Sequence, residues 1–350
     1  MDFSKYTDNN LLYTSFNQTN DCVIFGTKTG FYVYTLNPFK KIIARKIPGG
    51  VSIATMLYKS NIVIFVGNVE KGLYPKKKLI IWDDHKGTVI GEILFKHNVL
   101  NIKVTKKIII VVTEKKIYIY KFENLALIKS IETSENKKGL CAITYNDECY
   151  IAYPGDLKGD VNITKHQDDF LKVIKAHQNE IELLNIDSNG KYLVTSSERG
   201  TLLRIYDIHK SALLKELRRG SDQATIIDLK FSPNSKFLLC SSLKGTIHVF
   251  STCLNKEILN SNVSVGYGVS YFQSILPSYF SSEWSFVQFY FSNIRTYSIF
   301  TKNNNELITI GDNGCFYILS FENGKSSIVK TYKFISDEDD PFDNRTITIK

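Results

Sequence analysis

The chain has 350 residues, of which 43% are hydrophobic and 23% charged, and its formal net charge is +9 at pH 7. This apolar content is sufficient to bury a sizeable core, whereas no run of 18 apolar residues is present to form a transmembrane helix. The N-terminus lacks the pattern of a signal peptide and the six cysteines follow no metal-ligand spacing, so we expect a cytosolic protein with reduced, buried thiols, no metal and no cofactor.

A short turn followed by an alternating apolar strand recurs along the chain. These strands begin at Gly30, Lys78, Lys116, Gly159, Gly200, Gly245 and Gly314. A second apolar strand precedes most of them, at Cys22–Phe25, Ile62–Val66, Ile108–Val112, Tyr192–Ser196 and Phe237–Ser241. The first five intervals between strand starts are 48, 38, 43, 41 and 45 residues, which match the period of a propeller blade.

Seven such repeats predict an all-β, WD40-like propeller with seven four-stranded antiparallel blades. A two-domain sandwich is the alternative, but it would not explain the regular spacing. We expect one domain with a polar tail at 337–350 and with blades at about 11–48, 50–96, 97–134, 137–175, 177–217, 223–291 and 295–336.

The last interval is 69 residues, which predicts an insertion in the sixth blade at about 253–284. Its part from 266 to 284 carries the bulky apolar residues Tyr267, Tyr271, Phe272, Ile275, Leu276, Tyr279, Phe280 and Trp284, and Pro277 lies among them. Long loops on a rigid scaffold are usually functional. One interpretation is an apolar wedge that enters a membrane or a partner, and the other is a loop that folds back over its blade.

Four of the seven arginines lie within 21 residues, at Arg199, Arg204, Arg218 and Arg219, in a chain that otherwise uses lysine. A guanidinium offers a planar fork of donors that fits phosphate or carboxylate oxygens, which an ammonium does not. Ion pairs between strands are one explanation. The position of the adjacent pair between two similar strand units favours an anion site.

The two strand units that flank the arginine pair share the pattern Ser-Ser-x-(Arg/Lys)-Gly-Thr, beginning at Ser196 and at Ser241. Hydroxyl groups beside cations suit phosphate, because they donate hydrogen bonds where a carboxylate would repel. Since neighbouring residues of a strand point to opposite faces, Arg218 and Arg219 can serve two pockets. His177 precedes the first unit and His248 lies in the second; each is either a core residue or a ligand to the anion.

The tetrapeptide Leu217-Arg218-Arg219-Gly220 resembles the signature of the PROPPIN family of seven-bladed phosphoinositide-binding propellers, and the modest insertion resembles its smaller members. Similar segments run through nearly the whole chain, including 15–18, 81–87, 130–134, 138–142, 216–224 and 276–286. After Phe16-Asn17-Gln18 related sequences often carry Asp, whereas this chain has Thr19. In the family that region resembles a docking surface for autophagy lipid-transfer partners.

The resemblance implies two pockets for the head group of phosphatidylinositol 3-phosphate or 3,5-bisphosphate. The first pocket would use His177, Ser197, Thr201, Arg204 and Arg218, and the second would use Arg219, Ser241, Ser242, Thr246 and His248. The insertion would enter the membrane, and a monomer would attach to autophagosome precursors, endosomes or a vacuole-like organelle. If the histidines touch phosphate, binding should weaken as pH rises from about 5.5 through 7.5.

Other functions are less consistent with the sequence. No HExxH, GxSxG or Walker motif indicates an enzyme. Nucleic-acid binding would give a steep salt dependence with any polyanion, and no aromatic stacking platform lies among the arginines, so we expect no nucleic-acid partner. A protein scaffold without lipid dependence is the principal alternative, and it predicts that Arg218 and Arg219 are dispensable for membrane recruitment.

Overall fold

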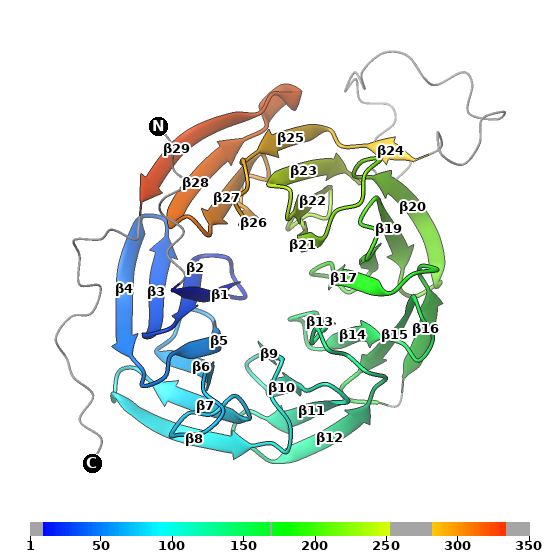
Figure 1. The fold of residues 1–350 in the computed structure, drawn as a ribbon. Helices are drawn as coiled ribbons and strands as arrows, with labels where there is room; N and C mark the ends of the chain where they lie inside the picture. The colour runs from blue at the N-terminus through cyan, green and yellow to red at the C-terminus, as the bar shows by residue number, and fades with distance from the viewer. Residues whose placement is uncertain (1–9, 169, 253–281, 334–350) are drawn as a thin grey trace, which may run out of the picture. The chain divides into compact units, whose positions relative to one another are not determined.

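Residues 10–168, 170–252 and 282–333 are described by the computed structural model, and they form a seven-bladed β-propeller. Each blade has four antiparallel strands that follow one another along the chain, as the strands β5 to β8 show (Figure 1). The exceptions are β24, which joins the fifth sheet as a parallel fifth strand, and β25, which therefore follows β23 in the sixth. The described residues contain one short 3-10 turn, η3 (Glu322–Gly324), and no helix that is long and apolar enough to span a membrane. The predicted fold class is therefore confirmed.

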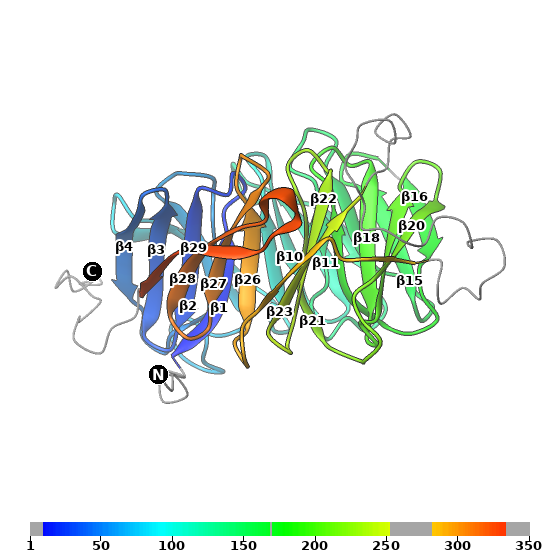
Figure 2. The ribbon, with the colours of Figure 1, turned by 90° about the horizontal axis from the view of Figure 1, so that it is seen from above.

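The first sheet comprises β1 (Leu11–Phe16), β2 (Cys22–Thr27), β3 (Gly30–Leu36) and β4 (Phe39–Lys46). The second comprises β5 (Val51–Met56), β6 (Ile62–Gly67), β7 (Lys78–Asp83) and β8 (Thr88–Leu94). The third comprises β9 (Asn101–Val104), β10 (Ile108–Val112), β11 (Lys116–Lys121) and β12 (Leu127–Glu132). The fourth comprises β13 (Ala142–Ile143), β14 (Tyr150–Pro154), β15 (Asp160–Lys165) and β16 (Leu171–Lys175). Figure 2 shows the strands of the first sheet lying side by side.

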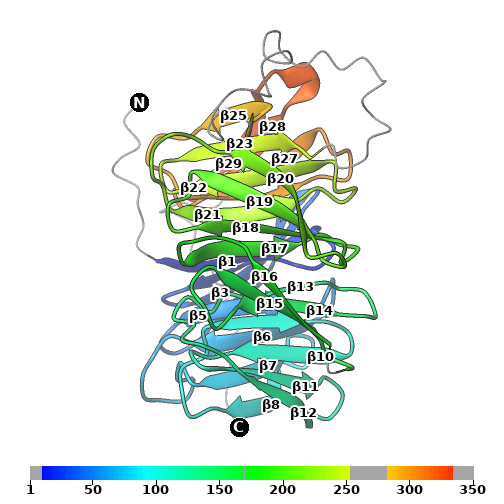
Figure 3. The same ribbon diagram turned by 90° about the vertical axis from the view of Figure 1, so that its right-hand side faces the viewer.

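The fifth sheet comprises β17 (Ile181–Ile186), β18 (Tyr192–Ser197), β19 (Leu202–Asp207), β20 (Ala212–Arg218) and β24 (Glu283–Trp284). The sixth comprises β21 (Ile226–Phe231), β22 (Phe237–Ser242), β23 (Thr246–Ser251) and β25 (Val287–Tyr290). The seventh comprises β26 (Thr296–Phe300), β27 (Glu306–Gly311), β28 (Cys315–Ser320) and β29 (Ser327–Lys333). The fifth sheet, in which β20 ends at Arg218 of the arginine pair, is on the side that faces the viewer in Figure 3.

Every predicted repeat begins at or just before the third strand of a sheet. The seven starts correspond to β3, β7, β11, β15, β19, β23 and β28. The second strands are almost entirely buried, because neighbours cover both faces; all five residues of β10 are buried, for example. By contrast, β8 alternates between exposed and half-buried residues, as expected of an outer strand.

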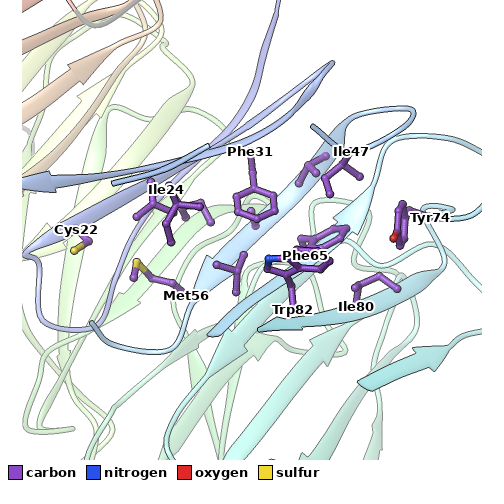
Figure 4. Packing of buried hydrophobic residues seen from close by; sticks show 14 residues of the cluster. Cys22, Ile24, Phe31, Ile47, Met56, Phe65, Tyr74, Ile80 and Trp82 are labelled. Carbon is purple, nitrogen blue, oxygen red and sulfur yellow. The ribbon is translucent and has the colours of Figure 1, made fainter. Parts of the chain in front are cut away.

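The described chain divides into two compact units, one built mainly of β1–β12 and the other mainly of β13–β27. In the first unit, side chains from the first two sheets form one core that includes Phe31, Phe65 and Trp82 (Figure 4). The rings of Phe31 and Phe65 lie 5.8 Å apart. Full burial of such a side chain contributes roughly 1.5–3 kcal/mol, so this packing joins sheets that would be marginal alone.

In the second unit, the fifth and sixth sheets bury a common apolar core. It contains Leu203 and Leu217 from the fifth sheet together with Leu238, Cys240 and Phe250 from the sixth. This packing fixes which side of β20 faces the sixth sheet. Of the five described cysteines, Cys315 alone is only partly buried, in agreement with the expected buried thiols.

Candidate functional site

Arg218 and Arg219 point to opposite sides of the fifth sheet. Leu217 belongs to the core shared with the sixth sheet, and alternation along the strand places Arg219 on that same side and Arg218 on the other. The charge of Arg219 acts on His248 and Cys240 of the sixth sheet, which agrees with this placement. Both arginines are 6% exposed, so each guanidinium is held within the protein.

Each guanidinium is anchored through its Nε atom. Arg218 donates from Nε to Oγ of Ser282 at 2.9 Å. Arg219 donates from Nε to the carbonyl of Gly200 at 2.9 Å and from Nη2 to the carbonyl of Asp222. Burial lowers the pKa of Arg219, whereas Cys240 and Asp222 raise it less. Two fixed guanidinium groups on either side of one strand form the centre of the candidate site.

The first predicted cluster brings His177 and Arg204 together. Thr195, Arg204 and Glu216 are cross-strand neighbours on β18, β19 and β20. His177 Nε2 lies 3.0 Å from Thr195 Oγ1, and Arg204 Nη1 donates to the carbonyl of Ala176 at 2.8 Å. Burial, and secondly the charge of Arg204, lower the pKa of His177 to about 4.

The remaining members of the first cluster lie on the same hairpin. Ser197 is buried two residues after Thr195, on the same face of β18, and Thr201 is half-buried in the turn before β19. Arg204 is not a free cation, because its Nε donates to Oε2 of Glu216 at 2.9 Å. An anion in this pocket would therefore meet both a cation and a carboxylate.

In the second predicted cluster, hydroxyl groups and a histidine gather on the face that Arg219 meets. Ser242 Oγ lies 2.8 Å from Thr246 Oγ1, and His248 Nδ1 lies 3.2 Å from Ser285 Oγ. His248 is 4% exposed. Burial, followed by the charge of Arg219, lowers its pKa to about 4.

Ser241 lies apart from the other members of this cluster. It pairs with Ile247, whereas Ser242 pairs with Thr246 and Cys240 with His248. The alternation of β22 therefore directs Ser241 to the face opposite Ser242. Its buried Oγ has no hydrogen-bond partner within the described residues. Its contribution to an anion site remains a prediction.

Backbone geometry explains why each Ser-Ser-x-(Arg/Lys)-Gly-Thr segment has a glycine at its fifth position. Gly200 and Gly245 adopt φ angles of +60° and +73°, in the left-handed region that favours glycine. A Cβ atom on Gly200 would lie 1.8 Å from the carbonyl oxygen of Ala224, and one on Gly245 would lie 1.7 Å from that of Phe291. The carbonyl of Gly200 also accepts the hydrogen bond from Nε of Arg219.

The end of the predicted insertion lies beside the first arginine. β24 pairs in parallel with β20, in the register Leu217 with Glu283 and Arg218 with Trp284 (Figure 1). The segment that leaves the sixth sheet after β23 thus returns first to the fifth sheet, which gains a fifth strand. Trp284 is 56% exposed there. The other predicted membrane residues, Tyr271, Phe272, Ile275, Leu276, Tyr279 and Phe280, lie outside the described residues.

Sequence reasoning missed four residues that contact the side chains predicted to bind the head groups, namely Thr195, Glu216, Ser282 and Ser285. Glu216 could have been found, because it lies two residues before Arg218 and therefore on the same face of a strand. Ser282 contacts Arg218 across 64 positions of sequence, a separation that no local pattern reveals.

Comparison with known proteins gives consistent matches. A model of the PROPPIN family matches residues 10–274. Autophagy-related protein 18e of Arabidopsis thaliana is 34% identical over 321 residues, covering 90% of this chain and 85% of the relative. SVP1-like protein 2 of Pichia angusta is 32% identical over 289 residues, covering 80% of each.

Solved structures share the fold. Hsv2 of Kluyveromyces lactis matches with a TM-score of 0.74 at 22% identity, over 94% of this chain and 100% of that one. KlAtg21, solved in complex with the coiled coil of AgAtg16, matches with a TM-score of 0.76 at 21% identity, over 93% and 100%. These identities support the fold alone. The family model and the two relatives, each of which spans most of the chain, establish that this protein belongs to the PROPPIN family.

Proposed function

We propose that the chain is a non-enzymatic peripheral membrane protein that binds phosphatidylinositol 3-phosphate and 3,5-bisphosphate. The head groups would occupy two pockets, one at Arg218 with His177, Ser197, Thr201 and Arg204, and one at Arg219 with Ser242, Thr246 and His248. The sequence also predicts Ser241 in the second pocket, although the alternation of β22 directs it to the opposite face. Membership of the PROPPIN family supports this proposal, and so does the chemistry of the two arginines.

One observation carries the proposal. The buried guanidinium groups of Arg218 and Arg219 are anchored on opposite sides of β20, and each side also has a histidine whose pKa is lowered to about 4, first by burial and then by a neighbouring guanidinium. A guanidinium that lowers the pKa of a neighbouring imidazole, in addition to the effect of burial, contributes positive potential at that position. A phosphate in that region would accept charge-assisted hydrogen bonds and would favour protonation of the histidine.

Two pockets on one rigid sheet would act together. A single exposed head group offers only a few charge-assisted bonds, offset by desolvation and ordering. When the first pocket has bound, capture of the second head group is intramolecular, and avidity rises by about 10²–10⁴. Trp284, exposed beside Arg218, would add apolar contact with the bilayer at about 25 cal/mol per Å² buried.

We infer a role in autophagy or endosomal trafficking on membranes rich in these lipids, and the names of relatives support the autophagy role. One is named autophagy-related protein 18e, and a structural neighbour was solved with the coiled coil of AgAtg16. We infer that the membrane-bound propeller recruits a trafficking partner.

Vesicle flotation tests the proposal. Wild type is compared with Arg218→Thr, Arg219→Thr and the double variant on phosphatidylcholine vesicles with phosphatidylinositol 3-phosphate, and on vesicles with phosphatidylserine of equal total charge. Each single variant should lose roughly 100-fold in affinity, because one of two linked sites is lost. Arg199→Thr removes an exposed arginine from the same blade and should bind as wild type does.

The same measurement distinguishes the principal alternative. Equal recruitment of wild type and the double variant, or equal binding to both vesicle types, would reject the lipid pockets in favour of a protein scaffold. Circular dichroism melting of each variant establishes that the loss of binding does not reflect unfolding, because both arginines are buried.

A further inference from the structure

Lys215 of β20 makes three contacts with segments that belong to the sixth blade and its insertion. Its Nζ donates to the carbonyl of Ser251 at 3.2 Å and to that of Thr252 at 2.9 Å, and it lies 2.8 Å from Oε2 of Glu283. An ammonium group has three donors, so these acceptors match its full capacity. The Lys215 side chain is only 12% exposed, which is unusual for a lysine.

The three acceptors come from the two ends of the segment 253–281. Ser251 and Thr252 lie at its start, where β23 ends, and Glu283 lies in β24 just after its end. We call these two ends the loop stems, residues 251–252 and 282–284. One lysine of the neighbouring blade therefore contacts both loop stems.

Two further contacts tie the second loop stem to the same strand. Arg218 donates to Ser282 Oγ, and β24 pairs with β20 at Leu217 and Arg218. The contact of Lys215 differs from these in reaching the first loop stem as well. It thus joins both ends of the segment 253–281 to β20.

We propose that Lys215 is a positioning residue that holds both loop stems on β20 and thereby keeps Trp284 beside the head-group pocket of Arg218. The expected effect of Lys215 on membrane binding rests on the proposed function, whereas its role in holding the loop stems does not. Lys215 would touch no lipid. It would act by presenting the apolar contact and the phosphate-binding arginine to one bilayer in a fixed relation, which lowers the ordering cost of binding.

Tryptophan fluorescence tests this directly. The chain has two tryptophans; Trp82 is 1% exposed and Trp284 is 56% exposed. Acrylamide, a neutral quencher, therefore reports on Trp284, and Trp284→Phe gives the background of Trp82. Lys215→Met keeps the length of the side chain and removes its donors, Glu283→Gln removes the charge of its partner, and Lys210→Met removes an exposed lysine of the same blade as the matched control.

In solution without vesicles, Lys215→Met should increase quenching of Trp284 and lower its fluorescence anisotropy, Glu283→Gln should do so less, and Lys210→Met should leave both at wild-type values. On vesicles with phosphatidylinositol 3-phosphate, Lys215→Met should weaken binding roughly tenfold, which corresponds to about 1.4 kcal/mol. The soluble head group, inositol 1,3-bisphosphate, should bind Lys215→Met and wild type equally, because Lys215 lies outside the pocket.

Unchanged quenching and anisotropy in Lys215→Met would overturn the proposal, whatever the vesicles show. If quenching and anisotropy change as expected but wild type does not bind the lipid, the proposed lipid function is wrong and the positioning of the loop stems by Lys215 is supported. A solution change with undiminished vesicle binding would overturn the membrane role of Lys215.

Discussion

Arg204 and Glu216 form an ion pair inside the first predicted pocket, with 2.9 Å between Nε and Oε2. The pair holds the guanidinium in place next to His177, but it also puts a carboxylate where a phosphate would bind. Both side chains keep about a quarter of their surface exposed, at 27% and 23%. Glu216 would therefore limit the affinity of this pocket while orienting its cation.

Replacement of Glu216 by Gln should strengthen binding of the head group. The amide can still accept a hydrogen bond from Arg204, and the repulsion of the phosphate is removed, so we expect a roughly fivefold lower Kd for inositol 1,3-bisphosphate by calorimetry. Glu306→Gln removes a carboxylate from the seventh blade and controls for net charge. Weaker binding by Glu216→Gln would show that orientation of Arg204 outweighs repulsion.

The two histidines should make stability depend on pH. The pKa values of His177 and His248 are about 4 in the folded protein, below the ordinary value near 6.5, so the unfolded chain binds more protons between these limits. The free energy of unfolding should consequently fall as pH decreases from about 6.5 towards 4, by roughly 1–3 kcal/mol per histidine. Urea unfolding at pH 7 and pH 4.5 measures this.

The variant His177→Gln/His248→Gln should lose less stability over that interval, and the other titrating groups cancel in the comparison. An identical loss in the variant would contradict the depressed values. The same values modify the sequence-based expectation for binding. Both imidazoles are neutral in the free protein from pH 5.5 to 7.5, so a histidine contribution to pH dependence requires protonation induced by the bound phosphate, whose own second ionisation also lies near pH 6.

Replacement by alanine should lower stability at one glycine near the arginines and leave it unchanged at another. In Gly200→Ala the added Cβ atom would lie 1.8 Å from the carbonyl oxygen of Ala224, and the alanine would have to adopt a φ of +60°. The substitution should therefore cost about 1–3 kcal/mol of stability and disturb the hydrogen bond between Arg219 and the Gly200 carbonyl. At Gly220, the last residue of the arginine motif, a Cβ atom would have no neighbour within 4 Å, and Gly220→Ala should unfold as wild type does. Equal denaturation midpoints for the two variants would refute this account.

Gln18 should matter for folding, although its segment was predicted as part of a docking surface. Its Nε2 donates to the carbonyls of Met56 and Val104 at 2.9 and 3.1 Å, and its Oε1 accepts from the amide of Tyr58, so one side chain links the first three sheets. Gln18→Leu should lower the free energy of unfolding by about 2–3 kcal/mol. Exposed Thr19 is the matched control, since Thr19→Ala should cost far less.

The sequence predicted the fold well because each blade repeats the same local physics. The repeat that begins at Gly159, for example, precedes a third strand, β15. The opposite orientation of Arg218 and Arg219 also followed from alternation alone. Contacts between segments far apart in the sequence could not be predicted. The parallel pairing of β24 with β20 and the hydrogen bond from Lys215 to Thr252 are examples, because no repeated pattern in the sequence relates their partners.

The return of β24 to β20 has a consequence for how this chain tolerates change. Because the two loop stems are fixed on one strand, the distance that the intervening residues must close is constant. Each doubling of such a segment costs only about 0.6 kcal/mol of closure entropy. The segment can therefore change in length while the arginines, histidines and stems keep their places.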